Sequence, residues 1–267
     1  MAVLVLLPAC GKAPIYEAVA TSYTGKEGAT SLSIPVPAST QGNAGGDLLV
    51  AVLGVKINPS TVGPSGWTVV SGMGGFNGAT CASDQEGIAC QLTAYYKIAS
   101  GSENNASFSW STIRQAAGAV LRYSRIDASA PIGASGQQRA STAAPTAPSI
   151  NTTRSESRVL SIALSEADDV DDAGAGLTDR VLGGAPTTPR FNLVSFPSAS
   201  VDLSKGCGPP ISGCSYTADA VGMAASDIRR QVMGATPAVS WTLPGADEWV
   251  AVTIEIRRPP DAGPVIQ

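Results

Sequence analysis

Five cysteines and a complete lack of histidine define the side-chain chemistry available to this chain of 267 residues. Cys81 and Cys90 are nine positions apart, and Cys207 and Cys214 are seven apart, in glycine-rich polar stretches typical of loops. A disulfide across each loop is geometrically easy and would restrain it. Free thiols are one alternative. Another is four thiolates on one zinc ion, although zinc-binding cysteines usually stand closer together within a pair. We favour two local disulfides, which imply an oxidising setting.

The absence of histidine excludes several catalytic classes. Ser-His-Asp and Cys-His catalysis, histidine-ligated zinc and the usual proton shuttle at neutral pH all need an imidazole. Carboxylates are scattered along the chain, and no pair is singled out for the acid and base of a glycosidase. The glycine-rich stretch 72–75 lacks the lysine and the context of a phosphate-binding loop. We therefore predict a protein that is not an enzyme and that has no catalytic residues.

Four aspartates close together form the best candidate for a cation site. They are Asp168, Asp169, Asp171 and Asp172. Calcium prefers carboxylate oxygens, so these side chains could hold a calcium ion. Their spacing is not that of an EF-hand loop, and a solvated acidic turn is the interpretation we favour. Calcium is the one cofactor that the sequence suggests.

Aromatic side chains are the candidates for binding a saccharide by stacking. The residues in question are Trp67, Tyr95, Tyr96 and Trp110. Aromatic residues at strand spacing more often pack in a core or on a sheet face. Tyr95 and Tyr96 are adjacent in a strand-like stretch, so their side chains point to opposite faces and one of them could be exposed.

The charge of the chain argues against nucleic-acid and membrane partners. Charged residues make up only 14% of the sequence, the net charge is −4 and the isoelectric point is about 4.9. No cluster of lysine and arginine exceeds two adjacent residues, so the basic footprint of a nucleic-acid-binding protein is missing. No apolar stretch approaches the length of a membrane span.

Short apolar or alternating stretches between turn residues predict an all-β fold. Glycine (29 residues) and proline (19) are abundant, and no segment has a sustained helical stripe. The continuous apolar run 47–54 predicts a central strand that is buried on both faces, or on one face with small residues opposite. The run 157–165 has a similar pattern, and 239–243 mirrors the alternation of 107–111, although two central strands would explain the first similarity. We predict a two-sheet antiparallel β-sandwich, of jelly-roll or lectin-like type, over residues 15–258.

The two ends of the chain differ in composition from this predicted sandwich. Residues 1–14 begin with an apolar run and are interpreted as an N-terminal arm, and 259–267 form a proline-rich tail. The run that ends at Cys10 also resembles a bacterial lipoprotein signal, with Cys10 as the lipidated residue. No lysine or arginine precedes the run, the run is short and a proline stands near its end, so we favour the arm.

Framework residues of the predicted sandwich carry a resemblance to a known group of proteins. They are found at 46–51, 64–68, 94–99, 108–111, 122–123, 127, 131–132 and 249–256. In these stretches the chain resembles bacterial and tailed-bacteriophage β-sandwich proteins over roughly residues 44–258. The shared features are turn glycines and core aromatic residues, so the resemblance implies a fold more strongly than a function. It offers no catalytic residues.

This resemblance implies a structural protein at a virion surface, as a capsid decoration or as part of a tail or fibre. Its expected partners are other virion proteins and further copies of itself in a homo-oligomer, attached through the terminal arms. The alternative is a carbohydrate-binding module of a bacterium, either secreted or anchored by lipid on its outer surface. Cleavage before Cys10 and a bound saccharide would distinguish that alternative.

Overall fold

All regular structure in the described part of the chain is β-strand, and every strand pair is antiparallel. The structure is a computed structural model. It describes residues 13–24, 28–40, 45–56, 61–73, 79–81, 90–167, 178–181, 187–194, 220–243 and 246–260.

Two large sheets form the centre of the molecule. The first large sheet contains, in spatial order, β1 (Ile15–Tyr23), β9 (Ala116–Ser124), β3 (Gly45–Lys56), β7 (Cys90–Ser100) and β5 (Thr68–Val69), with β6 (Ala79–Thr80) also paired to β7. The second large sheet contains β10 (Ile132–Thr142), β19 (Asp247–Ile256), β13 (Ser157–Ala167), β16 (Ala220–Arg230) and β15 (Thr188–Val194).

Two three-stranded outer sheets cover the large ones. The first outer sheet contains β2 (Ala29–Ile34), β8 (Ala106–Arg114) and β4 (Thr61–Val62). The second contains β11 (Thr146–Ala147), β18 (Val239–Thr242) and β14 (Thr178–Val181). A separate pair joins β12 (Asn151–Thr152) to β17 (Gly234–Ala235).

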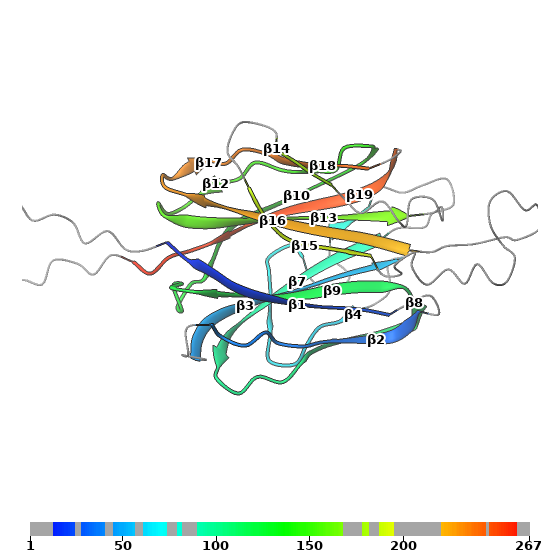
Figure 1. Ribbon diagram of the computed structural model, residues 1–267, viewed down its shortest axis with the longest axis horizontal. Coiled ribbons are helices and arrows are strands. Elements are labelled where there is room, and N and C mark those ends of the chain that lie inside the picture. Colours follow the sequence, from blue (N-terminus) through cyan, green and yellow to red (C-terminus); the bar gives the residue numbers. More distant parts are fainter. Residues whose placement is uncertain are drawn as a thin grey trace, which may run out of the picture.

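The sheets stack as four layers, with three apolar cores between them (Figure 1). The central core joins the two large sheets through β3, β7 and β9 on one side and β13, β16 and β19 on the other. Each outer core joins a large sheet to its outer sheet. Both large sheets are therefore covered on both faces. Successive residues of a strand point to opposite faces, so the apolar side chains on both faces are buried away from water.

Strand β3 shows how the sequence produces this arrangement. Its residues from Asp47 to Lys56 are all buried, as the apolar run predicted. Successive side chains point to opposite faces, so Leu48 contributes to the central core and its neighbour Leu49 to an outer core. Gly54 allows close packing of the large sheets, because a Cβ atom there would lie 2.3 Å from Leu164 Cδ1.

The chain contains an internal structural repeat. We call residues 13–124 the first half and 132–256 the second half. The order β1-β9-β3-β7-β5 in the first half has its counterpart in β10-β19-β13-β16-β15, and β2-β8-β4 has its counterpart in β11-β18-β14. Within this scheme the buried Trp110 of β8 and the buried Trp241 of β18 take equivalent places in the two outer cores. The similarity of 107–111 to 239–243 therefore reflects equivalent strands.

The prediction of an all-β antiparallel sandwich is confirmed. The structure adds that the range 15–258 holds two sandwiches of the same strand order, which share a central core. The connection between the halves is fixed to the last strand: the backbone N–H of Asp127 donates to Arg257 O at 2.9 Å, and that of Arg257 donates to Pro131 O at 2.8 Å. In this connection Arg125 takes a positive φ of 57°.

Candidate functional site

The edges of the two large sheets meet along two seams, and the edge strands β1 and β10 that form them are counterparts in the internal repeat. In the first, the edge strand β1 lies against β15. In the second, the edge strand β10 lies against β6. We call them the aromatic seam and the polar seam, after the side chains that fill them.

Aromatic and charged side chains close the aromatic seam. The guanidinium of Arg190 lies 3.9 Å from the ring centre of Tyr16, and that ring packs edge-on against Tyr123 at 5.8 Å. The buried carboxylate of Asp227 accepts hydrogen bonds from Arg190 Nη2 at 2.6 Å and from the Tyr123 hydroxyl at 3.2 Å. Arg158 Nη1 is 3.8 Å from the same carboxylate.

This cluster ties the two halves together. Tyr16 and Tyr123 belong to the first half, whereas Arg158, Arg190 and Asp227 belong to the second. Burial, followed by the charge of Asp227, holds the pKa of Tyr123 well above its ordinary value, so its hydroxyl stays protonated and donates. Because Arg190 contacts Tyr16 and Asp227 accepts from Tyr123 across the interface, the aromatic seam is a structural clasp.

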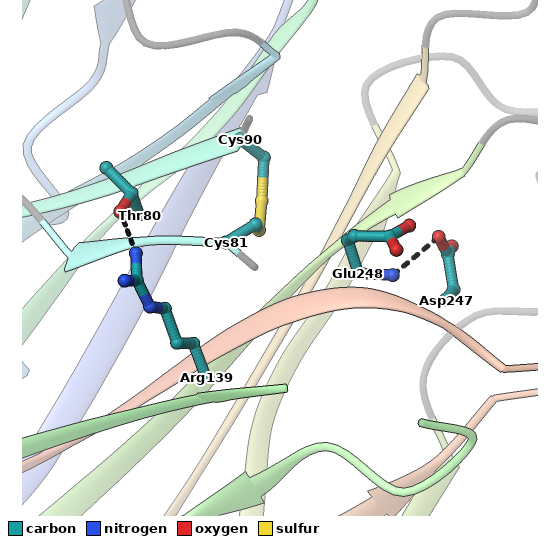
Figure 2. The surroundings of a disulfide bond; sticks show 6 residues. All are labelled: Thr80, Cys81, Cys90, Arg139, Asp247 and Glu248. Atoms are coloured by element: carbon teal, nitrogen blue, oxygen red, sulfur yellow. Dashed lines mark hydrogen bonds between the residues drawn. A yellow bond between two sulfur atoms is a disulfide. The ribbon is translucent and has the colours of Figure 1, made fainter. Parts of the chain in front are cut away.

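The polar seam is bridged by an arginine and leaves a hollow. Arg139 of β10 extends across to β6, where Nη1 donates to Thr80 Oγ1 at 2.8 Å (Figure 2). Beside this bridge is a hollow of about 390 Å³. The described residues that line it are Thr80, Gln137, Gln138, Arg139 and Val250. Four of these five residues carry polar side chains, and Val250 belongs to the central core.

A disulfide joins the strands next to this hollow. Cys81 and Cys90 are bonded to each other, their Cα atoms are 5.0 Å apart, and Cys81 follows directly after Thr80 (Figure 2). Both sulfur-bearing residues are buried in the central core, and the backbone N–H of Cys81 donates to Cys90 O at 2.8 Å. The prediction of this disulfide is confirmed. Cys207 and Cys214 lie outside the described residues.

The predicted stacking residues divide into two buried and two half-buried side chains. Tyr95 and Trp110 lie in an outer core, where Tyr95 packs edge-on against Phe108 at 5.7 Å. Trp110 also donates from Nε1 to Ala29 O at 2.8 Å. Packing therefore occupies both rings and leaves neither face open to a saccharide. Trp67 and Tyr96 are partly exposed, on opposite sides of the first large sheet, so stacking stays a prediction for these two alone.

The predicted calcium ligands Asp168, Asp169, Asp171 and Asp172 lie outside the described residues. Among the residues that the structure does describe, no group of three or more acidic or cysteine side chains is arranged to hold a metal ion.

One end of the molecule is rich in arginine, a feature that sequence reasoning missed. The strand registers bring nine arginines to the end where β1 begins and β19 ends. They are Arg122, Arg125, Arg154, Arg158, Arg190, Arg229, Arg230, Arg257 and Arg258. With Lys97 they make ten cationic side chains among the described residues of this end, against seven described carboxylates: Glu17, Asp47, Glu103, Asp127, Glu156, Asp227 and Glu255. We call this the arginine-rich end.

Most of these arginines stabilise local structure. Arg154 Nη1 lies 2.8 Å from Asp127 Oδ2, and Arg258 Nε donates to Ser155 O at 2.9 Å. Arg122 forms a buried pair with Asp47, with a nitrogen–oxygen distance of 3.4 Å. The surplus of cations nevertheless gives the end a positive charge in a protein whose net charge is −4.

A buried carboxylate organises the backbone at this end. Glu255 accepts from the backbone N–H of Ala134 at 3.0 Å and of Thr153 at 2.9 Å. It also accepts from Arg154 N at 3.1 Å and from Ser157 Oγ at 2.7 Å. Burial alone would raise the pKa of Glu255, but these hydrogen bonds outweigh it and hold the pKa below its ordinary value. The ionised carboxylate thus fixes the turn before β13 to the last strand.

No family model and no curated protein matches the chain. One solved structure aligns with it, that of the STIV MCP, a viral major capsid protein, with 10% identity and a TM-score of 0.24 over 90% of this chain and 97% of the other. A similarity of this size carries no argument about function.

Within the described residues, no helix is long and apolar enough to cross a membrane.

Proposed function

We propose that the protein is a non-enzymatic structural protein of a tailed-phage virion surface, either a capsid decoration or a protein of the tail or fibre. It forms a homo-oligomer and attaches to other virion proteins through its terminal segments. The observation that carries the proposal is that both described ends of the chain, at Ala13 and Pro260, lie at the arginine-rich end (Figure 1).

Placing both ends at one pole suits attachment. Residues 1–12 are largely apolar, and 261–267 continue the proline-rich tail. An extended segment can add a strand to the sheet edge of a neighbour through main-chain hydrogen bonds. The positive charge around the two ends would favour an acidic partner surface. The all-β body, with both large sheets covered, would then project from the attachment point.

The location is tested by electron microscopy of virions. Antibodies to the protein, detected with gold on particles from the source of the chain, should label the capsid or the tail. Labelling of bacterial envelopes with unlabelled particles would contradict the proposal.

The role of the N-terminal segment is tested by a deletion. A chain that lacks residues 1–12 should keep its circular dichroism spectrum and lose incorporation into particles, because the sandwich starts after this segment. A matched control replaces 1–12 with a glycine–serine segment of equal length and should also fail to incorporate. If the deleted chain incorporates as well as the complete one, the segment has no part in attachment.

Native mass spectrometry of the unreduced protein tests the oligomer and the rival function together. The proposal predicts a homo-oligomer whose N-terminal sequence extends ahead of Cys10. A monomer cut before Cys10 and carrying lipid would instead support a bacterial carbohydrate-binding module. The hollow of the polar seam is the observation that favours this second candidate, because its lining can form hydrogen bonds with hydroxyl groups.

A further inference from the structure

The internal repeat supplies a comparison between two seams whose edge strands, β1 and β10, are counterparts. At the aromatic seam, Tyr16 and Arg190 fill the space between the edges of the large sheets. At the polar seam the space between the edges holds a hollow of about 390 Å³. Pockets for small ligands span roughly 300–1,000 Å³, so the hollow is large enough for a small molecule.

The wall of the hollow follows from strand alternation in β10. Gln137 pairs with Val252 and Arg139 with Val250, and both valines belong to the central core. Gln137 and Arg139 therefore stand on the face of β10 that looks toward the first large sheet. Thr80 adds a hydroxyl to the polar lining, and the buried Val250 lies behind it. Gln138, which also borders the hollow, pairs with Ala251 and so points to the opposite face of β10.

Arg139 retains hydrogen-bonding capacity toward the hollow. A guanidinium has five N–H donors, and in the described part of the chain Arg139 contacts Thr80 Oγ1, with no carboxylate within ion-pair distance. Glu248 stands two residue pairs along the same seam, and its carboxylate accepts a hydrogen bond from Ser141 Oγ at 2.7 Å. The side chain of Arg139 is exposed, so a ligand can reach it.

From these features we propose that the hollow of the polar seam binds an acidic saccharide, a sugar that carries a carboxylate. The fork of Arg139 would bind the carboxylate through paired N–H donors. The amide of Gln137 both donates and accepts, as vicinal hydroxyl groups require. The site is independent of where on a particle or cell the protein resides.

The test is calorimetric titration of the full-length, unreduced chain with three acidic probes. They are tetragalacturonate, a tetrasaccharide containing glucuronate, and sialyllactose. At least one should bind saturably. If that probe is tetragalacturonate, its neutral methyl ester should bind about tenfold more weakly or worse, because the ester cannot form the charged pair. Absence of binding by all three, or equal binding of acid and ester, would overturn the proposal.

Substitutions at Arg139, with a control at Arg114, test whether the saccharide binds in the polar seam. Arg139→Gln should weaken binding about tenfold or more. The affinity of Arg139→Lys should lie between those of the native chain and Arg139→Gln, because lysine keeps the positive charge and lacks the paired N–H donors of the guanidinium. Arg114→Gln, on β8 outside the seam, is the matched control and should bind as the native chain does. If Arg139→Gln binds the probe as tightly as the native chain and unfolds at the same temperature as Arg114→Gln, the saccharide does not bind in the polar seam.

Discussion

Single buried carboxylates carry much of the specificity of this structure. Glu255 and Asp227 each accept several hydrogen bonds in places that water does not reach. A buried charge is tolerable when its hydrogen bonds are complete, and removing one partner leaves the others unsatisfied. Substitution of either carboxylate should therefore cost far more than substitution of an exposed one.

Replacing Glu255 by glutamine tests the first of these groups. At pH 7 the variant should lose about 3 kcal/mol of unfolding free energy, because charged hydrogen bonds become neutral or are broken. The folded-state pKa lies below the ordinary value of 4.5, so the ionised group stabilises the fold above that pH and less so as pH falls through the folded pKa. Urea unfolding of both chains should show their difference shrinking as pH drops below 4.5.

Glu156→Gln serves as the control for this measurement. Glu156 is half-buried and pairs with the exposed Arg229, so its loss should change stability by less than about 1 kcal/mol. A difference between native chain and Glu255→Gln that stays constant from neutral to acidic pH would contradict the role of ionised Glu255.

Asp227→Asn tests the aromatic seam. Asparagine has the shape of aspartate but lacks the charge that Arg190 and Arg158 face. The free energy of unfolding should therefore fall by about 3 kcal/mol. The pKa of Tyr123 should fall toward its ordinary value, because the charge of Asp227 is one of the causes that raise it. Urea unfolding and spectrophotometric titration of tyrosine give the two results. Unchanged stability would mean that the cluster does not hold the halves together.

At the scale of elements, the disulfide fixes the short strand β6 against β7. Closing a loop of this length should stabilise the fold by about 2.5 kcal/mol, by limiting the unfolded chain. Replacing Cys81 and Cys90 together by alanine should lower the midpoint of thermal unfolding, as measured by calorimetry. Adding a reductant to the native protein should lower the midpoint of thermal unfolding by a similar amount. Equal stability of native and double-variant chains would contradict this prediction.

The sequence was a good guide to elements whose pattern is local. The apolar run in β3 and the alternation in β8 predicted buried strands, because strand periodicity directly encodes which faces are covered. The Cys81–Cys90 pair was found by spacing alone. In contrast, Tyr95 and Trp110 belong to the core whereas Trp67 and Tyr96 are partly exposed, and a short strand pattern does not distinguish the two outcomes.

Features that depend on contacts between strands far apart in the sequence could not be predicted from it. The arginines of the arginine-rich end come from positions between 122 and 258, never more than two in succession, so no window of the sequence shows them gathered. The polar seam needs β6 and β10 side by side, although they are far apart along the chain. The second sandwich was not predicted from the sequence either, because equivalent strands of the two halves share a hydrophobic pattern but few identical residues.

At the scale of the whole molecule, the central core decides how the protein unfolds. The halves share the apolar contacts between the two large sheets, so neither half can keep that face covered alone. We expect one cooperative transition in calorimetry, with the calorimetric enthalpy equal to the van't Hoff enthalpy. Two resolved transitions would show that each half is stable by itself. Co-expressed halves, cut between Arg125 and Pro131, should associate.

The position of both described ends at one pole also determines how the molecule responds to force. Tension between the two ends would separate β1 and β19 from their neighbours one hydrogen-bonded pair after another, because the pull acts across the strands at a single pole. Pulling lengthwise from opposite poles would load all the pairs at once. A molecule fastened by both ends to the same support escapes this weakness, because no tension runs through its body. Its rigid layers then act as a lever, and drag on the free pole is felt at the attachment point.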